Sequence, residues 1–424
     1  MIRKPALTGT IIGRSAIIAN GEEFRFIPSP CNNYDINRTM KPDSIAVIGG
    51  GPAGAMAAAQ LAAAGSQVVL IDEKLAWEKP CGGGLTHKAL ERYPFLAEAE
   101  AERNWVRGCE LVSPGGRRAW FELDKQIVIF SRRVLNGLML ERARTAGAKI
   151  ICERVVEIAG RPGAWRLRTR HDELTATYIV LAAGARNPFR FSAPLAPADL
   201  MATAGYYIPG SGDSIHISFL PGVEGYIWLF PRRDHFSAGI CGKMDAIPTS
   251  HLRRMLERWL AQRGFDARQG EFYSHVLPAP RVSTLQLRTL QGENWALVGD
   301  AACLVDSITG EGLYYALRSA ELLAQALTAG TPELYTHNAR QELLPELETA
   351  ARFAHAFYSG HFLGGKVLDR MVQFTAASRR VRRLMCDVFS GAQGYVGLRR
   401  RAYRTFFCAL PEVLLGMHSA EPAE

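Results

Sequence analysis

The stretch "IAVIGGGPAGAMAAAQLAAAGSQVVLIDEK", residues 45–74, limits the fold of this chain more than any other. Its pattern predicts a buried strand, a tight glycine turn, an alanine-rich helix and a second strand. Gly49, Gly51 and Gly54 complete G-x-G-x-x-G, in which the glycines make the turn, admit a pyrophosphate and let the helix pack closely. Asp72 ends the second strand, where a carboxylate can bind ribose hydroxyls. These residues predict a Rossmann-type unit for FAD or NAD.

A second nucleotide-binding segment lies far downstream, at residues 294–327. A buried strand leads into Asp300, whose carboxylate can bind a ribityl or ribose hydroxyl. Gly310 and Gly312 then open a long helix. Bare N–H groups at such a helix start can face the carbonyl edge of an isoalloxazine ring, where negative charge accumulates on reduction. This segment therefore favours a flavin.

The composition is that of an ordinary globular protein, with 48% hydrophobic and 21% charged residues in 424. That length suggests about two or three domains. The eight cysteines are scattered without a C-x-x-C pair, which predicts reduced thiols, a cytoplasmic location and no metal site. No run of about eighteen apolar residues occurs, so we expect no membrane-spanning helix.

Positive charge is concentrated near the C-terminus. Residues 360–404 hold ten Lys or Arg against two Asp, which accounts for +8 of the net +9. Such a tract suits an anionic membrane surface or an acidic protein, and a solvated helical face is the simpler alternative. We predict no nucleic-acid partner, because no recognition motif accompanies the charge.

The first residues are predicted as a separate extension, 1–43. They are basic and hold no acid before Glu22, which resembles a transit peptide. Met40 lies just before the first strand, so a later start codon explains the extension equally well.

Four ordered motifs carry a resemblance to a known family: "KPCGGGLT" (79–86), "YIWLFP" (226–231), "GDAACLVDSITGEGLYYALRSAELLA" (299–324) and "DVFSGAQGYVGLRR" (387–400). Together with the glycine fingerprint, they resemble the geranylgeranyl reductases, within the flavoprotein class that includes the aromatic hydroxylases. The resemblance implies an α/β fold with a Rossmann-type FAD-binding domain, an inserted antiparallel-sheet substrate domain and a helical, basic C-terminal region. The implied boundaries are 44–200 and 283–335 for the FAD-binding domain, 201–282 for the substrate domain and 336–424 for the helical region.

The resemblance also implies site residues. The cofactor-binding set is Gly49, Gly51, Gly54, Asp72, Cys81, Gly82, Gly83, Arg132, Asp300, Gly310 and Gly312. The substrate-binding set is Tyr226, Trp228, Phe230 and Pro231, and the catalytic candidates are Cys81 and Tyr226.

The residues themselves leave alternatives open at two of these motifs. Glycines 82–84 lack a Cβ, so they can lie against a planar ring, admit a bulky substrate or form a flexible connector. Cys81 either packs there or relays a proton. Residues 226–230 alternate with period two, which fits an ordinary central strand or, through three aromatic rings on one face, the wall of an apolar pocket. We expect antiparallel strands over 201–242 and 270–286, joined by a hairpin at 109–123.

The implied function is reduction of C=C bonds in a geranylgeranyl chain on a lipid, quinone or chlorophyll-type carrier, with hydride from reduced FAD. Cys81, Tyr226 or water would give the proton. NADPH or reduced ferredoxin would reduce the flavin. A greasy substrate and the basic 360–404 tract together suggest docking on a membrane surface.

Departures from the family pattern weaken the case for NADPH. Ala183 stands where the wider class has an Asp that helps to position flavin and pyridine nucleotide. Asn136, Ser307 and Cys241 replace a usual Asp, Pro and Gly.

Three rival functions remain. An aromatic monooxygenase or halogenase shares the fold, although Lys74, Lys79 and Lys88 do not lie in a halogenase motif. An electron-transfer flavoprotein or a prenyl-lipid-binding protein without turnover would also fit.

Overall fold

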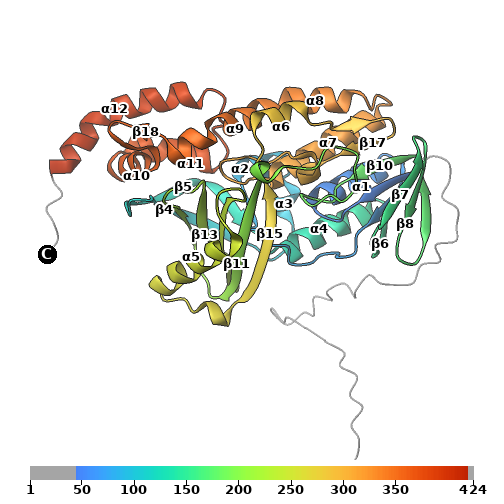
Figure 1. Ribbon diagram of the computed structural model, residues 1–424, viewed down its shortest axis with the longest axis horizontal. Helices are drawn as coiled ribbons and strands as arrows, with labels where there is room; N and C mark the ends of the chain where they lie inside the picture. The colour runs from blue at the N-terminus through green and yellow to red at the C-terminus, as the bar shows by residue number, and fades with distance from the viewer. Residues whose placement is uncertain (1–43, 419–424) are drawn as a thin grey trace, which may run out of the picture. The chain divides into compact units, whose positions relative to one another are not determined.

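The structure is a computed structural model that describes residues 44–418, with side chains up to residue 412. Figure 1 shows this part of the chain in colour. The predictions made for residues 1–43 lie outside the described residues.

The first sheet is the predicted Rossmann-type sheet, in the order β16-β17-β10-β1-β2-β6. Its strands are β1 (Ser44–Ile48), β2 (Gln67–Ile71), β6 (Lys149–Ile151), β10 (Tyr178–Leu181), β16 (Gln291–Gly292) and β17 (Trp295–Leu297). All neighbours are parallel except the edge pair β16 and β17. The strand of the downstream segment, β17, thus belongs to the same sheet as β1, the strand of the N-terminal fingerprint.

The glycine turn of the fingerprint fixes how α1 (Pro52–Ala63) leaves β1. Gly49 has a φ of +112°, and a Cβ there would lie 2.3 Å from the carbonyl oxygen of Ala182. A Cβ on Gly54 would lie 1.8 Å from the carbonyl oxygen of Gly49. Only glycine permits these approaches, so the turn and the close packing predicted from the sequence are both present.

The second sheet has eight strands in the order β15-β11-β14-β13-β12-β4-β5-β3. They are β3 (Gly84–Leu85), β4 (Asn104–Val112), β5 (Arg118–Ile129), β11 (Leu200–Pro209), β12 (Ser214–Phe219), β13 (Gly225–Pro231), β14 (His235–Lys243) and β15 (Glu271–Pro278). The expected antiparallel sheet is confirmed, and the hairpin at 109–123 joins it through β4 and β5. The strand expected over 270–286 is too long, because β15 ends at Pro278 and Val282–Leu287 form the helix α6.

One pair in this sheet differs from the expectation, because β12 runs parallel to β4. The long connection between them, which includes α4 and strands of the first sheet, permits a parallel pairing that a short hairpin cannot make. The sheet therefore also takes in strands from before residue 130. The domain boundaries at 200/201 and 282/283 stay predictions.

The two faces of β13 meet different partners. Ile227 and Leu229 pack with the buried leucines of α5 (Thr249–Gln262). Tyr226 and Phe230 pack toward a cluster that contains side chains from the C-terminal helices. The period-two pattern of the sequence thus separates a core face from a face that borders the site.

The remaining elements complete the described part of the chain. The helices are α2 (His87–Arg92), α3 (Phe95–Glu98), α4 (Arg132–Thr145), α6 (Val282–Leu287), α7 (Leu313–Thr328), α8 (Leu334–Glu342), α9 (Leu344–Ser359), α10 (Val367–Ala377), α11 (Arg379–Phe389) and α12 (Leu398–His418). Short 3-10 turns span Pro197–Asp199, Ala267–Gln269 and Gly299–Ala302. A small sheet holds β7 (Glu157–Arg161), β8 (Ala164–Arg168) and β9 (Glu173–Ala176), and β18 (His361–Phe362) pairs with β19 (Gly365–Lys366).

The C-terminal region is helical, as predicted, and it packs on the second sheet. Figure 1 shows α10 and α11, in red, beside β4 and β5. Leu368 and Val372 of α10 and Val381 of α11 are buried in one cluster with Phe121 and Ile129 of β5. None of the helices within residues 44–418 combines the length and the apolar character that crossing a bilayer requires.

We predict that Gly54→Ala lowers the free energy of unfolding by about 3 kcal/mol, because the new methyl would overlap a backbone carbonyl that cannot move aside. Gly137→Ala, within α4, is the matched control, since a Cβ there would lie 3.8 Å from Ala76 Cβ, an ordinary contact distance. Urea denaturation of the two variants measures the difference. Equal stability of the two would contradict the packing described.

Candidate functional site

A cavity of about 860 Å³ lies along the start of α1, the glycine loop after β2 and the second sheet, and continues to the C-terminal helices. Its nucleotide end includes Gly51, Lys79, Arg132, Asp300 and Gly310 to Gly312. Its other end is apolar, with side chains such as Ile217, Trp228, Phe357, Met385, Phe389 and Phe406. The nucleotide segments and the aromatic strand that the sequence singled out therefore border one cavity.

The start of α1 offers an open cradle for an anion. Gly51 is the N-cap of the helix, lines the cavity and has no neighbouring atom where a Cβ would stand. Free N–H groups at this helix end carry partial positive charge. The space that an absent side chain leaves is thus in the right place for a pyrophosphate.

Arg132 adds a cation to the same end of the cavity. It is buried at the start of α4, and its Nε and Nη2 donate to Asn136 Oδ1 at 3.3 and 3.2 Å. Asn136 is the residue that departs from a usual Asp. Because an amide orients the guanidinium without neutralising it, the full positive charge remains available to phosphate.

Asp300 and Lys79 face each other across the cavity wall, with Lys79 Nζ 3.4 Å from Asp300 Oδ2. A Cβ on Gly312 would lie 3.1 Å from Asp300 Oδ1, so the carboxylate lies beside the glycine start of α7. This juxtaposition of a carboxylate and bare N–H groups suits a ribityl chain and a flavin ring edge.

His275 of β15 is a cavity residue that the sequence interpretation missed. Its Nε2 has no hydrogen-bond partner within the described part of the chain. Desolvation, with repulsion from Lys79, lowers its pKa to about 4, so the imidazole is neutral at physiological pH. An unpaired polar atom in the cavity wall, the open cradle at Gly51 and the free cation of Arg132 together fit FAD. A single histidine within a strand gave no signal of this in the sequence.

Not every residue predicted to bind cofactor or substrate lines the cavity. Gly49 and Gly54 shape the turn, and Pro231 is buried in β13. Asp72 accepts hydrogen bonds from Gly50 N at 2.6 Å and Lys74 N at 2.8 Å, while burial raises its pKa. Its carboxylate thus ties the glycine turn to the end of β2, and a ribose contact stays a prediction.

The "CGGG" loop is held by a buried ion pair that the sequence interpretation also missed. Arg232, only 1% exposed, pairs with Glu78 and donates from Nη2 to Cys81 O at 2.9 Å. Ser237 Oγ donates to the same carbonyl at 3.0 Å. Glu78 also accepts from Arg132 N at 2.8 Å. Burial opposes ionisation of Glu78, but the Arg232 charge and these donors lower its pKa overall.

Glycines 82–84 are packed rather than loose. A Cβ on Gly82 would lie 2.7 Å from the Phe230 ring, and one on Gly83, whose φ is +83°, would lie 2.0 Å from Phe130 O. Gly84 pairs with β5. The loop therefore lies against the aromatic strand and an adjacent backbone, which excludes the flexible-connector interpretation.

Cys81 and Tyr226, the two catalytic candidates, both line the cavity. Cys81 Sγ accepts from Gly83 N at 3.3 Å. The Tyr226 hydroxyl donates to Thr309 O, and desolvation raises its pKa well above the usual value. Tyr226 therefore keeps its proton and anchors the loop before α7. Its catalytic role stays a prediction.

The aromatic face of β13 forms part of the wall. The Tyr226 and Trp228 ring centroids are 6.0 Å apart, and Phe230 covers the glycine loop. Trp228 Nε1 donates to Ser237 Oγ at 3.4 Å, so its polar atom is paired while its ring borders the cavity. This surface suits an apolar ligand.

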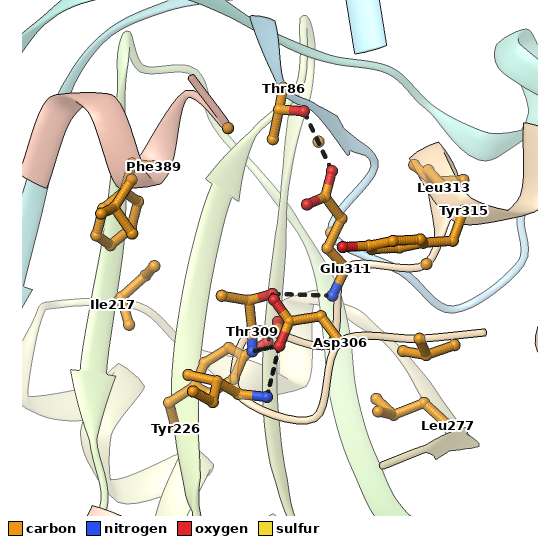
Figure 2. A pocket seen from close by; sticks show the side chains of 18 of the residues that line it. Thr86, Ile217, Tyr226, Leu277, Asp306, Thr309, Glu311, Leu313, Tyr315 and Phe389 are labelled. Atoms are coloured by element: carbon orange, nitrogen blue, oxygen red, sulfur yellow. Dashed lines mark hydrogen bonds between the residues drawn. The ribbon is translucent and has the colours of Figure 1, made fainter. Parts of the chain in front are cut away.

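The C-terminal motif folds back over the loop before α7. Tyr395 donates to Asp306 Oδ2 at 2.8 Å, and Asp306 also accepts from Ile308 N and the Thr309 hydroxyl, both at 2.7 Å. Figure 2 shows Asp306 and Thr309 together below Glu311. The third and fourth family motifs are thus joined directly by a hydrogen bond.

The cysteines in the described residues are free thiols, as predicted. Cys241 is buried in β14 behind Tyr226, whose carbonyl its Sγ contacts at 3.7 Å. Across residues 44–418, no cluster of three or more His, Cys, Asp or Glu could hold a metal ion.

Several known proteins are similar to this chain in sequence. The pattern of the pyridine nucleotide-disulphide oxidoreductase family matches residues 43–205. A geranylgeranyl diphosphate reductase of Synechocystis is 26% identical, covering 81% of this chain and 88% of its own length. A digeranylgeranylglycerophospholipid reductase of Methanocaldococcus jannaschii is 27% identical, covering 77% and 87%. The resemblance to the geranylgeranyl reductases is confirmed.

Solved structures confirm the fold. A geranylgeranyl bacteriochlorophyll reductase-like protein of Thermoplasma acidophilum superposes with a TM-score of 0.70 at 19% identity, covering 86% of this chain and 99% of its own. A probable FAD-dependent monooxygenase of Pseudomonas aeruginosa has a TM-score of 0.57 at 18% identity, covering 75% and 96%. The α/β fold is therefore shared with one protein named as reductase-like and one named as a monooxygenase, so the fold alone does not choose between these two activities.

We predict that Gly51→Ala folds normally but loses bound FAD by about tenfold or more, because the methyl would occupy the space where the helix start meets a pyrophosphate. Flavin absorbance per mole of purified protein measures this. Gly137→Ala, within α4, adds the same methyl at ordinary contact distance from Ala76 and is the control. Unchanged flavin content in Gly51→Ala would exclude this cradle.

Proposed function

We propose that this chain is an FAD-dependent reductase that saturates C=C bonds in the geranylgeranyl chain of a lipid, quinone or chlorophyll-type carrier. The observation that carries the proposal is the single cavity, which joins a nucleotide cradle to an apolar, aromatic-lined space. The names of the similar reductases support the same substrate class. The proposal places the chain in isoprenoid lipid metabolism.

In this proposal, one end of the cavity binds the cofactor and the other end binds the prenyl chain. When bound, reduced FAD supplies the hydride equivalent that alkene reduction needs. Arg132, the start of α1 and Asp300 would hold the cofactor, and Gly310 to Gly312 would face its ring; all of these residues line the cavity. Trp228, Phe230 and Phe389 exclude water and orient the prenyl chain.

The electron donor is NADPH or reduced ferredoxin. Ala183, in place of an Asp, favours a donor that needs no built pyridine-nucleotide site. Chemical reduction by dithionite replaces either donor in a test.

The second candidate function is an aromatic monooxygenase or halogenase, which the shared fold favours. The lysines near the first motif have other partners: Lys79 pairs with Asp300, and Lys88 Nζ lies 4.0 Å from the Tyr314 ring centroid. These are the two lysines that line the cavity in the described part of the chain, and both are engaged, which disfavours a halogenating role.

We propose that the C-terminal part of the cavity opens toward a membrane. Tyr403, 44% exposed, lines the cavity, and Phe407, 64% exposed, stacks on it with ring centroids 6.4 Å apart. Exposed Arg399, Arg400 and Arg404 lie on the same helix. Aromatic rings beside arginines suit an anionic bilayer surface, where each basic residue contributes roughly 1 kcal/mol. A prenyl chain would then pass from the bilayer to the cavity without crossing water.

The purified yellow protein, reduced by dithionite without oxygen and incubated with geranylgeranyl lipids, should give products heavier by pairs of hydrogens. Mass spectrometry of the lipid measures this. No change across several head groups would refute the reductase. A gain of one oxygen or one halogen, after oxygen and reductant are admitted, would establish the second candidate.

The double variant Tyr403→Ser/Phe407→Ser should bind vesicles containing anionic phospholipid about tenfold more weakly, because two rings that can enter the interface are lost. Vesicle sedimentation at low and high salt measures this. Leu287→Ser, which removes an 83% exposed apolar side chain on α6, is the control. Salt-sensitive binding to an acidic ferredoxin with no binding to vesicles would contradict the membrane proposal.

A further inference from the structure

Glu311 is an acid in the cavity wall to which the sequence interpretation gave no role. It lies between Gly310 and Gly312 at the start of α7, beside the predicted flavin ring edge. Figure 2 shows its carboxyl directed away from Asp306 and toward Thr86, whose hydroxyl donates to Glu311 Oε1 at 3.1 Å. The carboxyl therefore lies where the nucleotide end of the cavity meets the glycine motif.

The other acids that line the cavity are engaged more fully. Asp300 pairs with Lys79. Asp306 accepts from several backbone and hydroxyl donors. Glu346 accepts from the backbone N–H groups of Tyr395 and Val396. These carboxylates hold the loops in place, whereas the Glu311 carboxyl is held by one hydroxyl contact within the described residues.

The surroundings of Glu311 favour a carboxyl that carries a proton near neutral pH. The titratable groups that face it are Lys88, Asp306, Tyr314, Tyr315 and Tyr395. Desolvation raises the pKa of Glu311 to about 7, and repulsion from Asp306 acts in the same direction, while Lys88 and Thr86 oppose it. A group with this pKa can give a proton and recover it from water at physiological pH.

The other proton sources fit less well. The Tyr226 hydroxyl donates to Thr309 O, and its high pKa keeps the proton on oxygen. The Cys81 thiol is tied to Gly83 N.

We infer that Glu311 is the acid that protonates the prenyl double bond, an inference that rests on the proposed function. The π bond of the alkene breaks and two C–H bonds form. One alkene carbon takes the hydride equivalent that reduced FAD supplies, and the other takes the proton from the Glu311 O–H. Glu311 is left as a carboxylate, FAD is left oxidised, and water returns the proton to Glu311 before the next turnover.

Glu311→Gln tests the inference, because the amide keeps the shape and can still accept from Thr86 but has no acidic proton. With dithionite-reduced protein and a geranylgeranyl lipid, we expect the rate to fall about 100-fold or more. The wild-type rate should fall as pH rises above about 7. Thr86→Val should shift this decrease in rate to higher pH, because the substitution removes a hydrogen-bond donor that lowers the pKa of Glu311. Glu333→Gln, at an exposed position before α8, is the matched control.

A second readout does not depend on turnover. Infrared spectra of the oxidised flavoprotein at a series of pH values should show a protonated carboxyl band that titrates near pH 7. The band should be absent from Glu311→Gln and present in Glu333→Gln. A band that persists in Glu311→Gln belongs to another acid and overturns the inference.

The outcomes separate the inference from the proposed function. If wild-type protein reduces the lipid and Glu311→Gln matches its rate and pH profile, this inference fails and the reductase stands. If Cys81→Ser or Tyr226→Phe instead abolishes the reaction while Glu311→Gln does not, that residue is the acid. If wild-type protein reduces no prenyl lipid, the proposed function and the proton donation both fail.

Discussion

The buried ion pair between Arg232 and Glu78 is the interaction on which the cavity depends. Arg232 follows β13 of the second sheet, Glu78 follows β2 of the first, and the same carboxylate also accepts from the start of α4. Removal of one partner would leave an uncompensated charge in the interior, at a cost of about 3–5 kcal/mol. Because Arg232 also holds the Cys81 carbonyl, the pair fixes the glycine loop against both sheets at once.

Much of the fold could be predicted because its signals are local. The glycine spacing requires a turn at Gly49 and close packing at Gly54, and the structure has both. The alternation along β13 separates its aromatic face from its aliphatic face without any knowledge of the partners. Such patterns depend on backbone geometry, which a single stretch of sequence specifies.

The features that were missed depend on distant partners. The parallel pairing of β12 with β4 joins strands about a hundred residues apart, so no turn signal could reveal it. Asp72 has the position of a ribose ligand, and its carboxylate also accepts from the Gly50 and Lys74 N–H groups, a contact that the spacing of the motif did not indicate. Glu311 lies in the third family motif, whose glycines indicate a nucleotide-binding helix start but whose pattern assigns no role to the side chain between them. Its environment is set by Thr86 and Asp306, which the sequence alone does not bring together.

The apolar walls of the cavity would affect which double bond of a long substrate is reduced. A polyprenyl chain is built from identical five-carbon units, and an apolar hydrocarbon wall distinguishes one unit from the next only weakly. Under the proposed function, the chain can shift by one repeat and offer each double bond in turn to a fixed hydride and a fixed acid. The extent of saturation would then depend on how far the chain can advance before its head group reaches the proposed membrane-side opening near Tyr403, which lines the cavity.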